Sequence, residues 1–96
     1  MTADGINIIY ESIKNNILKC QVLVNGSYKD IEIQKYEVTT DSIKIYVYLD
    51  EDVVGTITKY RLITTAGKVF DEKNDTISKD GSRGLLTLFE YKIKEE

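Results

Sequence analysis

The spacing of apolar residues along this chain changes once, near residue 17. Before that point, five apolar residues recur at the three- and four-residue spacing of one helix face: Ile6, Ile9, Tyr10, Ile13 and Ile17. Asp4 or Thr2 can cap the start of such a helix by accepting a free backbone N–H. We therefore predict a helix over about 4–16, although the segment 6–10 also fits a short strand.

After residue 17, apolar and polar residues alternate with a period of two, which is typical of half-buried strands. We predict strands over about 18–24, 29–38, 43–49, 56–65, 68–70 and 85–93. Asn25-Gly26 and Ala66-Gly67 mark tight turns. The apolar positions change parity within 29–38, which predicts a bulge or a break near Gln34-Lys35. We expect 71–75 to be a polar loop and 76–78 to be a short extended piece.

Together these elements predict one domain over residues 1–96. Its class is α+β, mostly β, with an N-terminal helix packed on an antiparallel β-meander or sandwich-like sheet. The helix needs an apolar surface on which to bury its stripe, and a sheet face provides one.

The strand over 43–49 is apolar on one face and carries Lys44, Tyr46 and Tyr48 on the other. One short helix shields only part of a sheet, so a second subunit is a candidate cover for the tyrosine face. Aromatic anchors dominate interface energetics, and we therefore expect Tyr46, Tyr48 and Tyr60 at an interface. Tyrosines near Lys44 and Arg61 could instead stack nucleic-acid bases.

Composition favours the interface over base stacking. The formal net charge is −3, whereas nucleic-acid binding needs a basic surface. The chain is 42% hydrophobic and 30% charged, as in ordinary globular domains. It has neither an apolar run long enough to cross a bilayer nor the basic and apolar start of a secretory signal. We expect neither nucleic acid nor membrane as a partner.

The chemistry available to the chain is limited, because it has no His and only one Cys. Nucleophile–His pairs are therefore impossible, and a cysteine–histidine zinc site is equally excluded. Cys20 lies in an apolar run and is expected to be a buried small hydrophobe. Asp50-Glu51-Asp52 could form a carboxylate pair or bind calcium, but adjacent residues point different ways and a solvated strand end is favoured. We predict no enzyme activity, catalytic residue, metal or cofactor.

Several segments, taken in order, resemble phage tail-fibre and baseplate attachment domains of the N-terminal tail-fibre-like family. They are Thr2-Ala3-Asp4-Gly5 before an Ile-rich helix, Val22-Leu23-Val24-Asn25-Gly26, the strand from Asp41 to Val47, the hairpin from Ile57 to Phe70, and the closing pair Ile77-Ser78-Lys79 and Leu85 to Ile93. One departure is Tyr60-Arg61-Leu62, where members often carry Glu-x-Gly-Leu.

The resemblance implies a non-enzymatic structural component of a bacteriophage tail or phage-tail-like particle, used in baseplate or fibre attachment. It implies homo-oligomers, contacts with other tail or baseplate proteins, assembly in the bacterial host cytoplasm and a final place in the virion tail. The chain would be a stand-alone component or a domain of something longer. The alternative is a small β-rich ligand-binding module, for example for carbohydrate, that uses the same tyrosines as a platform.

Overall fold

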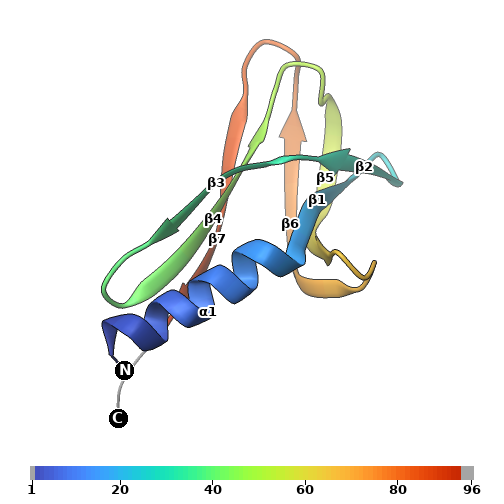
Figure 1. Ribbon diagram of the computed structural model, residues 1–96. Helices are drawn as coiled ribbons and strands as arrows, with labels where there is room; N and C mark the ends of the chain where they lie inside the picture. The colour runs from blue at the N-terminus through green and yellow to red at the C-terminus, as the bar shows by residue number, and fades with distance from the viewer. Residues whose placement is uncertain (1, 94–96) are drawn as a thin grey trace.

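Seven antiparallel strands follow one helix in the structure, a computed structural model that describes residues 2–93 (Figure 1). In chain order the elements are α1 (Ala3–Asn16), β1 (Ile17–Val24), β2 (Ser27–Ile31), β3 (Ile33–Val38), β4 (Ser42–Leu49), β5 (Gly55–Thr64), β6 (Val69–Lys79) and β7 (Leu85–Lys92).

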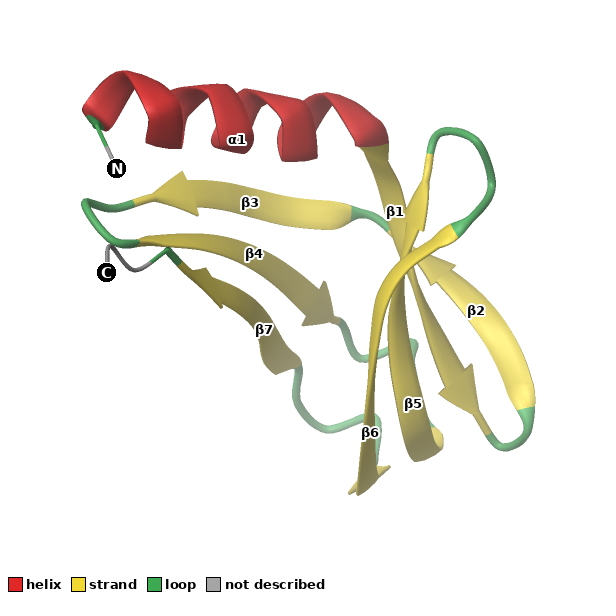
Figure 2. Cartoon of the chain, turned by 90° about the horizontal axis from the view of Figure 1, so that it is seen from below, coloured by secondary structure: helices red, strands yellow, loops and turns green. Residues whose placement is uncertain are grey.

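The N-terminal helix is confirmed, and the alternative of a strand over 6–10 is wrong. The Thr2 hydroxyl accepts the Gly5 backbone N–H at 3.0 Å and so caps the first turn. Ile6 is buried, whereas Ile8, which lies off the apolar stripe, is 71% exposed. α1 lies alongside β3 and leads directly into β1 (Figure 2), so its apolar stripe covers one side of the sheets.

The strands form two antiparallel sheets, with the orders β2-β1-β5-β6 and β3-β4-β7. Their inner faces enclose one apolar core, to which both sheets contribute fully buried residues: Cys20, Val22, Ile57 and Leu62 from the first, and Ile45, Val47 and Leu49 from the second. The predicted class, an α+β domain that is mostly β with a sandwich-like sheet, is confirmed.

Both predicted glycine turns are confirmed. Asn25 (φ 50°) and Gly26 (φ 82°) form the two-residue turn between β1 and β2. Positive φ at both central positions is the conformation that Asn-Gly favours in tight hairpins. Gly67 (φ 79°) lies in the turn between β5 and β6.

The predicted run over 29–38 is not one strand of one sheet. It divides at Glu32 into β2 and β3, which belong to different sheets, so the chain crosses from one layer to the other there. The expected irregularity near Gln34-Lys35 is confirmed by a register shift between Ile33 and Lys35 in the pairing with β4. The change of parity in the sequence marks this register shift.

The predicted polar loop over 71–75 is wrong, because it is the middle of the long strand β6. This strand is polar for a structural reason: two of its inward side chains bridge to β7 instead of packing in the core. The Tyr91 hydroxyl donates to the Asp71 carboxylate at 2.6 Å, and the Lys73 ammonium donates to the Leu88 carbonyl at 2.7 Å. Side chains, rather than backbone pairs, thus join the two sheets along this margin.

A buried lysine fixes the loop between β4 and β5. Lys79 is only 6% exposed, and its ammonium donates to the backbone carbonyls of Asp50 (2.6 Å), Val53 (2.7 Å) and Asp80 (3.2 Å). An ammonium group has three donors, so these three carbonyls use its full capacity. The interaction ties the ends of β4 and β6 together.

We expect Lys79→Met to lower the free energy of unfolding by about 2–3 kcal/mol, because it removes charge-assisted hydrogen bonds and leaves buried carbonyls unpaired. Urea unfolding followed by circular dichroism measures this change. Lys68→Met, in the exposed turn between β5 and β6, is the matched control and should stay within about 0.5 kcal/mol of the parent. A Lys79→Met protein as stable as this control would contradict the assigned role.

Candidate interaction surface

The outward side of the β3-β4-β7 sheet carries an apolar surface made by two neighbouring strands. Tyr46 and Tyr48 project from β4, and Leu86 and Leu88 project from β7. The register pairs Tyr46 with Leu88 and Tyr48 with Leu86, so the four side chains form two adjacent rows. Tyr48 is 41% and Leu86 is 54% exposed. We call these four residues the apolar outer face.

Charged side chains border the apolar outer face on two sides. Lys35 of β3 lies beside Tyr46, with its ammonium 5.7 Å from the centre of the Tyr46 ring, and a charged row lies at one end of the face. Lys44 of β4 is paired across the strands with Glu90 of β7, and their charged atoms lie 4.0 Å apart. The same ammonium lies 3.9 Å from the Glu37 carboxylate of β3, which also accepts a hydrogen bond from the Tyr46 hydroxyl at 3.4 Å. These contacts limit the movement of Tyr46 and place both signs of charge at one end of the face.

A glycine positions the other tyrosine of the face. The Tyr48 phenol ring lies directly over Gly84, and a Cβ at that position would overlap the hydroxyl and ring atoms. Gly84 precedes β7, so this close approach holds the ring toward the Leu85–Lys92 strand. Any larger residue at position 84 would displace the ring.

The outer side of the four-stranded sheet carries a network of polar side chains. The Asp30 carboxylate accepts hydrogen bonds from Lys19 and Gln21, both at 2.8 Å. Gln21 in turn accepts from Arg61 at 2.9 Å, and the Arg61 guanidinium stacks 3.7 Å from the centre of the Tyr28 ring. The hydrogen bond from Lys19 is the main reason that the pKa of Asp30 is lowered. This polar network is satisfied within the chain.

Two of the three predicted interface tyrosines, Tyr46 and Tyr48, lie together, but Tyr60 does not join them. Tyr60 is 1% exposed and belongs to the core between the sheets, so it is not available to a partner. Its expected neighbour Arg61 faces outward on the other sheet and stacks on Tyr28. The surface proposed for base stacking therefore lacks that cation.

Leu86 and Leu88 were not among the sequence-predicted site residues. In the strand over 85–93, residues 85, 87, 89, 91 and 93 share one face, and Leu86 and Leu88 lie on the other face. The signal that could have identified them is the presence of apolar residues at both odd and even positions of one strand. Such a strand has one apolar face more than the core of a two-layer fold can use.

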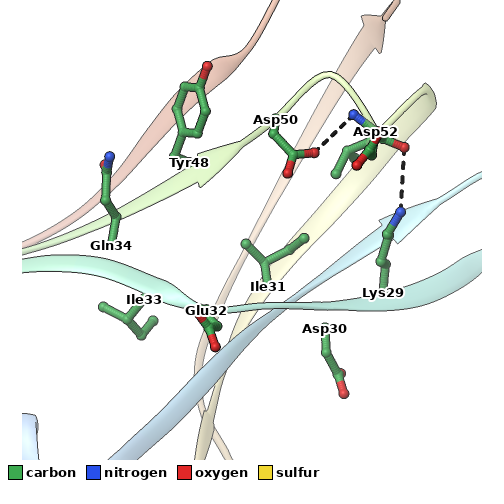
Figure 3. A pocket seen from close by; sticks show the side chains of 10 residues that line it. Lys29, Asp30, Ile31, Glu32, Ile33, Gln34, Tyr48, Asp50 and Asp52 are labelled. Carbon is green, nitrogen blue, oxygen red and sulfur yellow. Dashed lines mark hydrogen bonds between the residues drawn. The ribbon is translucent and has the colours of Figure 1, made fainter.

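A hollow of about 540 Å³ lies where β2 crosses to β3 (Figure 3). Its walls are the crossing strand, Tyr48 and the turn after β4, and the residues that line it are Lys29, Asp30, Ile31, Glu32, Ile33, Gln34, Tyr48, Asp50, Asp52 and Val53. The lining combines carboxylate, amide, ammonium and phenol groups with three apolar side chains, Ile31, Ile33 and Val53. A hydrogen bond from Lys29 to the Asp52 carbonyl, at 3.5 Å, spans part of the opening.

The acidic triplet Asp50-Glu51-Asp52 forms an exposed turn after β4, as predicted. The Asp50 carboxylate accepts the Asp52 backbone N–H at 2.9 Å, so it stabilises its own turn. Within residues 2–93, no three side chains of metal-binding type come together.

Cys20 is confirmed as a buried core residue, with no exposed surface. Burial raises the pKa of its thiol from 9.0 to about 12, because the thiolate would lose its hydration. The pKa values of Tyr36, Tyr60 and Tyr91 are raised as well, chiefly by burial. In Tyr91 the hydrogen bond donated to Asp71 adds to the effect.

Comparison with models of protein families, with curated proteins and with solved structures finds no match to this chain. The one helix in the described part of the chain is too short and too polar to cross a membrane.

The raised pKa values predict a loss of stability at alkaline pH. Unfolded Cys20 ionises near pH 9.0 whereas the folded thiol stays protonated, so its contribution is complete below pH 9 and declines as the pH rises toward about 12. We expect Cys20 alone to cost on the order of 2 kcal/mol of unfolding free energy by pH 11, with the tyrosines adding to the loss.

Urea unfolding at pH 8 and pH 11, followed by circular dichroism under reducing conditions, measures this loss. In Cys20→Ala the decrease between the two pH values should be smaller by about the same 2 kcal/mol. Equal decreases in the variant and the parent would show that Cys20 is not the titrating group.

Proposed function

We propose that this protein is a non-enzymatic assembly component that works through the apolar outer face. The observation that carries the proposal is the pair of rows formed by Tyr46, Tyr48, Leu86 and Leu88. Grouped exposed apolar side chains on a small domain are typical of protein interfaces. They are also held in place, since Tyr46 bonds to Glu37 and Tyr48 rests on Gly84.

We further propose that the assembly is a bacteriophage tail or a phage-tail-like particle, with the chain in a baseplate or fibre attachment. The support is the resemblance of its successive segments to that family, together with a mostly β fold of one helix and seven strands in residues 2–93. In this role the chain assembles in the host cytoplasm, contacts copies of itself and other tail proteins, and ends in the virion tail.

Purified particles from the source organism test this proposal directly. Quantitative mass spectrometry should recover tryptic peptides, such as the one over 45–59, at a fixed ratio to the major tail proteins. Their absence from intact particles would remove the virion role.

We expect Leu86→Ser/Leu88→Ser to fold normally and to reduce incorporation into particles more than about tenfold. Each buried Leu side chain contributes about 1.5–3 kcal/mol, and a factor of ten in binding needs only about 1.4 kcal/mol. Leu18→Ser is the matched control, because Leu18 is 57% exposed but lies on β1. Equal incorporation of both variants would show that the apolar outer face is not the interface.

A second function, binding of a small ligand such as a carbohydrate, is supported by the hollow beside Tyr48. An aromatic ring next to amide and carboxylate groups offers both stacking and hydrogen bonding to a sugar. If this function holds, a monosaccharide and oligosaccharide panel should shift the NMR signals of Tyr48, Gln34 and Asp50. Gln34→Ala should then weaken binding at least about tenfold, whereas a chain that only assembles through the outer face would show no shift of these signals when a sugar is added.

A further inference from the structure

We propose that two copies of this chain pack through their apolar outer faces about a twofold axis that runs parallel to the strands, between β4 and β7. The inference rests on the proposed function and names a partner for the same surface, a second copy. The order of residues along the two strands makes the apolar outer face complementary to itself.

Three consecutive cross-strand rows build the surface. They pair Tyr48 with Leu86, Tyr46 with Leu88, and Lys44 with Glu90. A twofold axis parallel to the strands exchanges β4 and β7 while keeping the height of every row. Tyr48 then lies over Leu86 of the second copy, Tyr46 over Leu88, and Lys44 over Glu90. Each aromatic ring therefore meets an aliphatic side chain, and each ammonium meets a carboxylate.

The charged row selects this axis over the other in-plane choice. An axis perpendicular to the strands that passes through the central Tyr46–Leu88 row reverses the order of the rows and puts Lys44 and Glu90 of one copy against the Tyr48–Leu86 row of the other. Both charges would then lose water without gaining a partner, which is costly. With the parallel axis, Lys44 and Glu90 keep their partners within the chain and gain new ones across the axis.

Ordinary sheet packing permits these contacts. Aligned sheets pack about 10 Å apart with their strands rotated by about 30°. The charged row is two residues, or about 7 Å, from the central Tyr46–Leu88 row, so the rotation displaces it by only about 3.5 Å. The Lys44 side chain is long and 27% exposed, and it can cover that displacement.

The association should stop at a dimer, because the opposite side of the molecule does not offer a second apolar outer face. The outer side of the four-stranded sheet carries the polar network around Asp30, Gln21 and Arg61, whose hydrogen bonds are made within its own chain. A twofold contact buries the same patch on both copies, so no second apolar outer face is left to extend it. Because the face is small, the dimer should be weak and should depend on concentration.

Charge reversal across the axis tests the proposal. Lys44→Glu places carboxylates opposite Glu90 of the second copy, and Glu90→Lys places ammonium groups opposite Lys44, so each variant alone should self-associate at least about tenfold more weakly than the parent. Mixed in equal amounts, the two variants should form a heterodimer, since both contacts across the axis are then between opposite charges. The double variant Lys44→Glu/Glu90→Lys should regain the parental homodimer.

Sedimentation velocity at concentrations up to about 1 mM measures self-association, and native mass spectrometry with one variant labelled with nitrogen-15 identifies the heterodimer. Circular dichroism checks folding. If a charge-reversed variant fails to fold, Lys44→Gln and Glu90→Gln provide a second series. These variants place no like charges together, so their loss of self-association should be smaller. Lys59→Glu, on the outer side of the other sheet, is the charge-matched control and should dimerise like the parent.

A parent protein that stays monomeric up to about 1 mM would overturn the proposal, as would single variants that dimerise like the parent or a mixture that gives no heterodimer. These outcomes are separate from the test in particles. A monomeric chain that is still incorporated into tails leaves the assembly role standing and moves the apolar outer face to a different partner. A chain that dimerises in solution but is absent from particles would support the packing of two copies and contradict the role in the virion tail.

Discussion

The alternation of side chains along β4 is the constraint on which the rest of this structure depends. β4 is the central strand of its sheet, and its inward residues Ile43, Ile45, Val47 and Leu49 are all fully buried. Since successive side chains of a strand point to opposite faces, the residues between them must point outward. The core therefore fixes the positions of the outward tyrosines, and shifting the strand by one residue would invert both faces together.

The two margins of the sandwich keep this arrangement from sliding. At one margin the backbone itself crosses between the sheets at Glu32, and at the other the Tyr91–Asp71 hydrogen bond and the Lys73 ammonium bridge β7 and β6. Lys79 adds a third connection by holding the loop between β4 and β5. A surface carried by strands that are restrained in this way loses little conformational entropy on binding. The entropy cost of binding a partner is therefore small.

The sequence carried enough information for the class and most elements, because amphipathic periodicity and Asn-Gly turns act locally. It failed where tertiary contacts assign a residue its role. The polar residues of β6 suggest a loop until Asp71 and Lys73 are seen to bridge to β7. Tyr60 is aromatic and next to a charge, like an interface residue, yet it fills the core. No local pattern distinguishes these cases, since the deciding partners are distant in sequence.

The contrast between the two outer faces connects the fold to its proposed use. In a small domain much of the surface stays exposed, and an exposed apolar face carries a risk of nonspecific association. The four-stranded sheet pairs its outer charges internally, and its exposed apolar side chains are spread over three strands, with Leu18 on β1, Tyr28 on β2, and Val69 and Phe70 on β6. The three-stranded sheet keeps its apolar rows but ends them with Lys44 and Glu90, which penalise a misaligned partner by leaving a charge without its complement. The apolar rows supply the attraction, and the charged row determines the orientation in which it can be used.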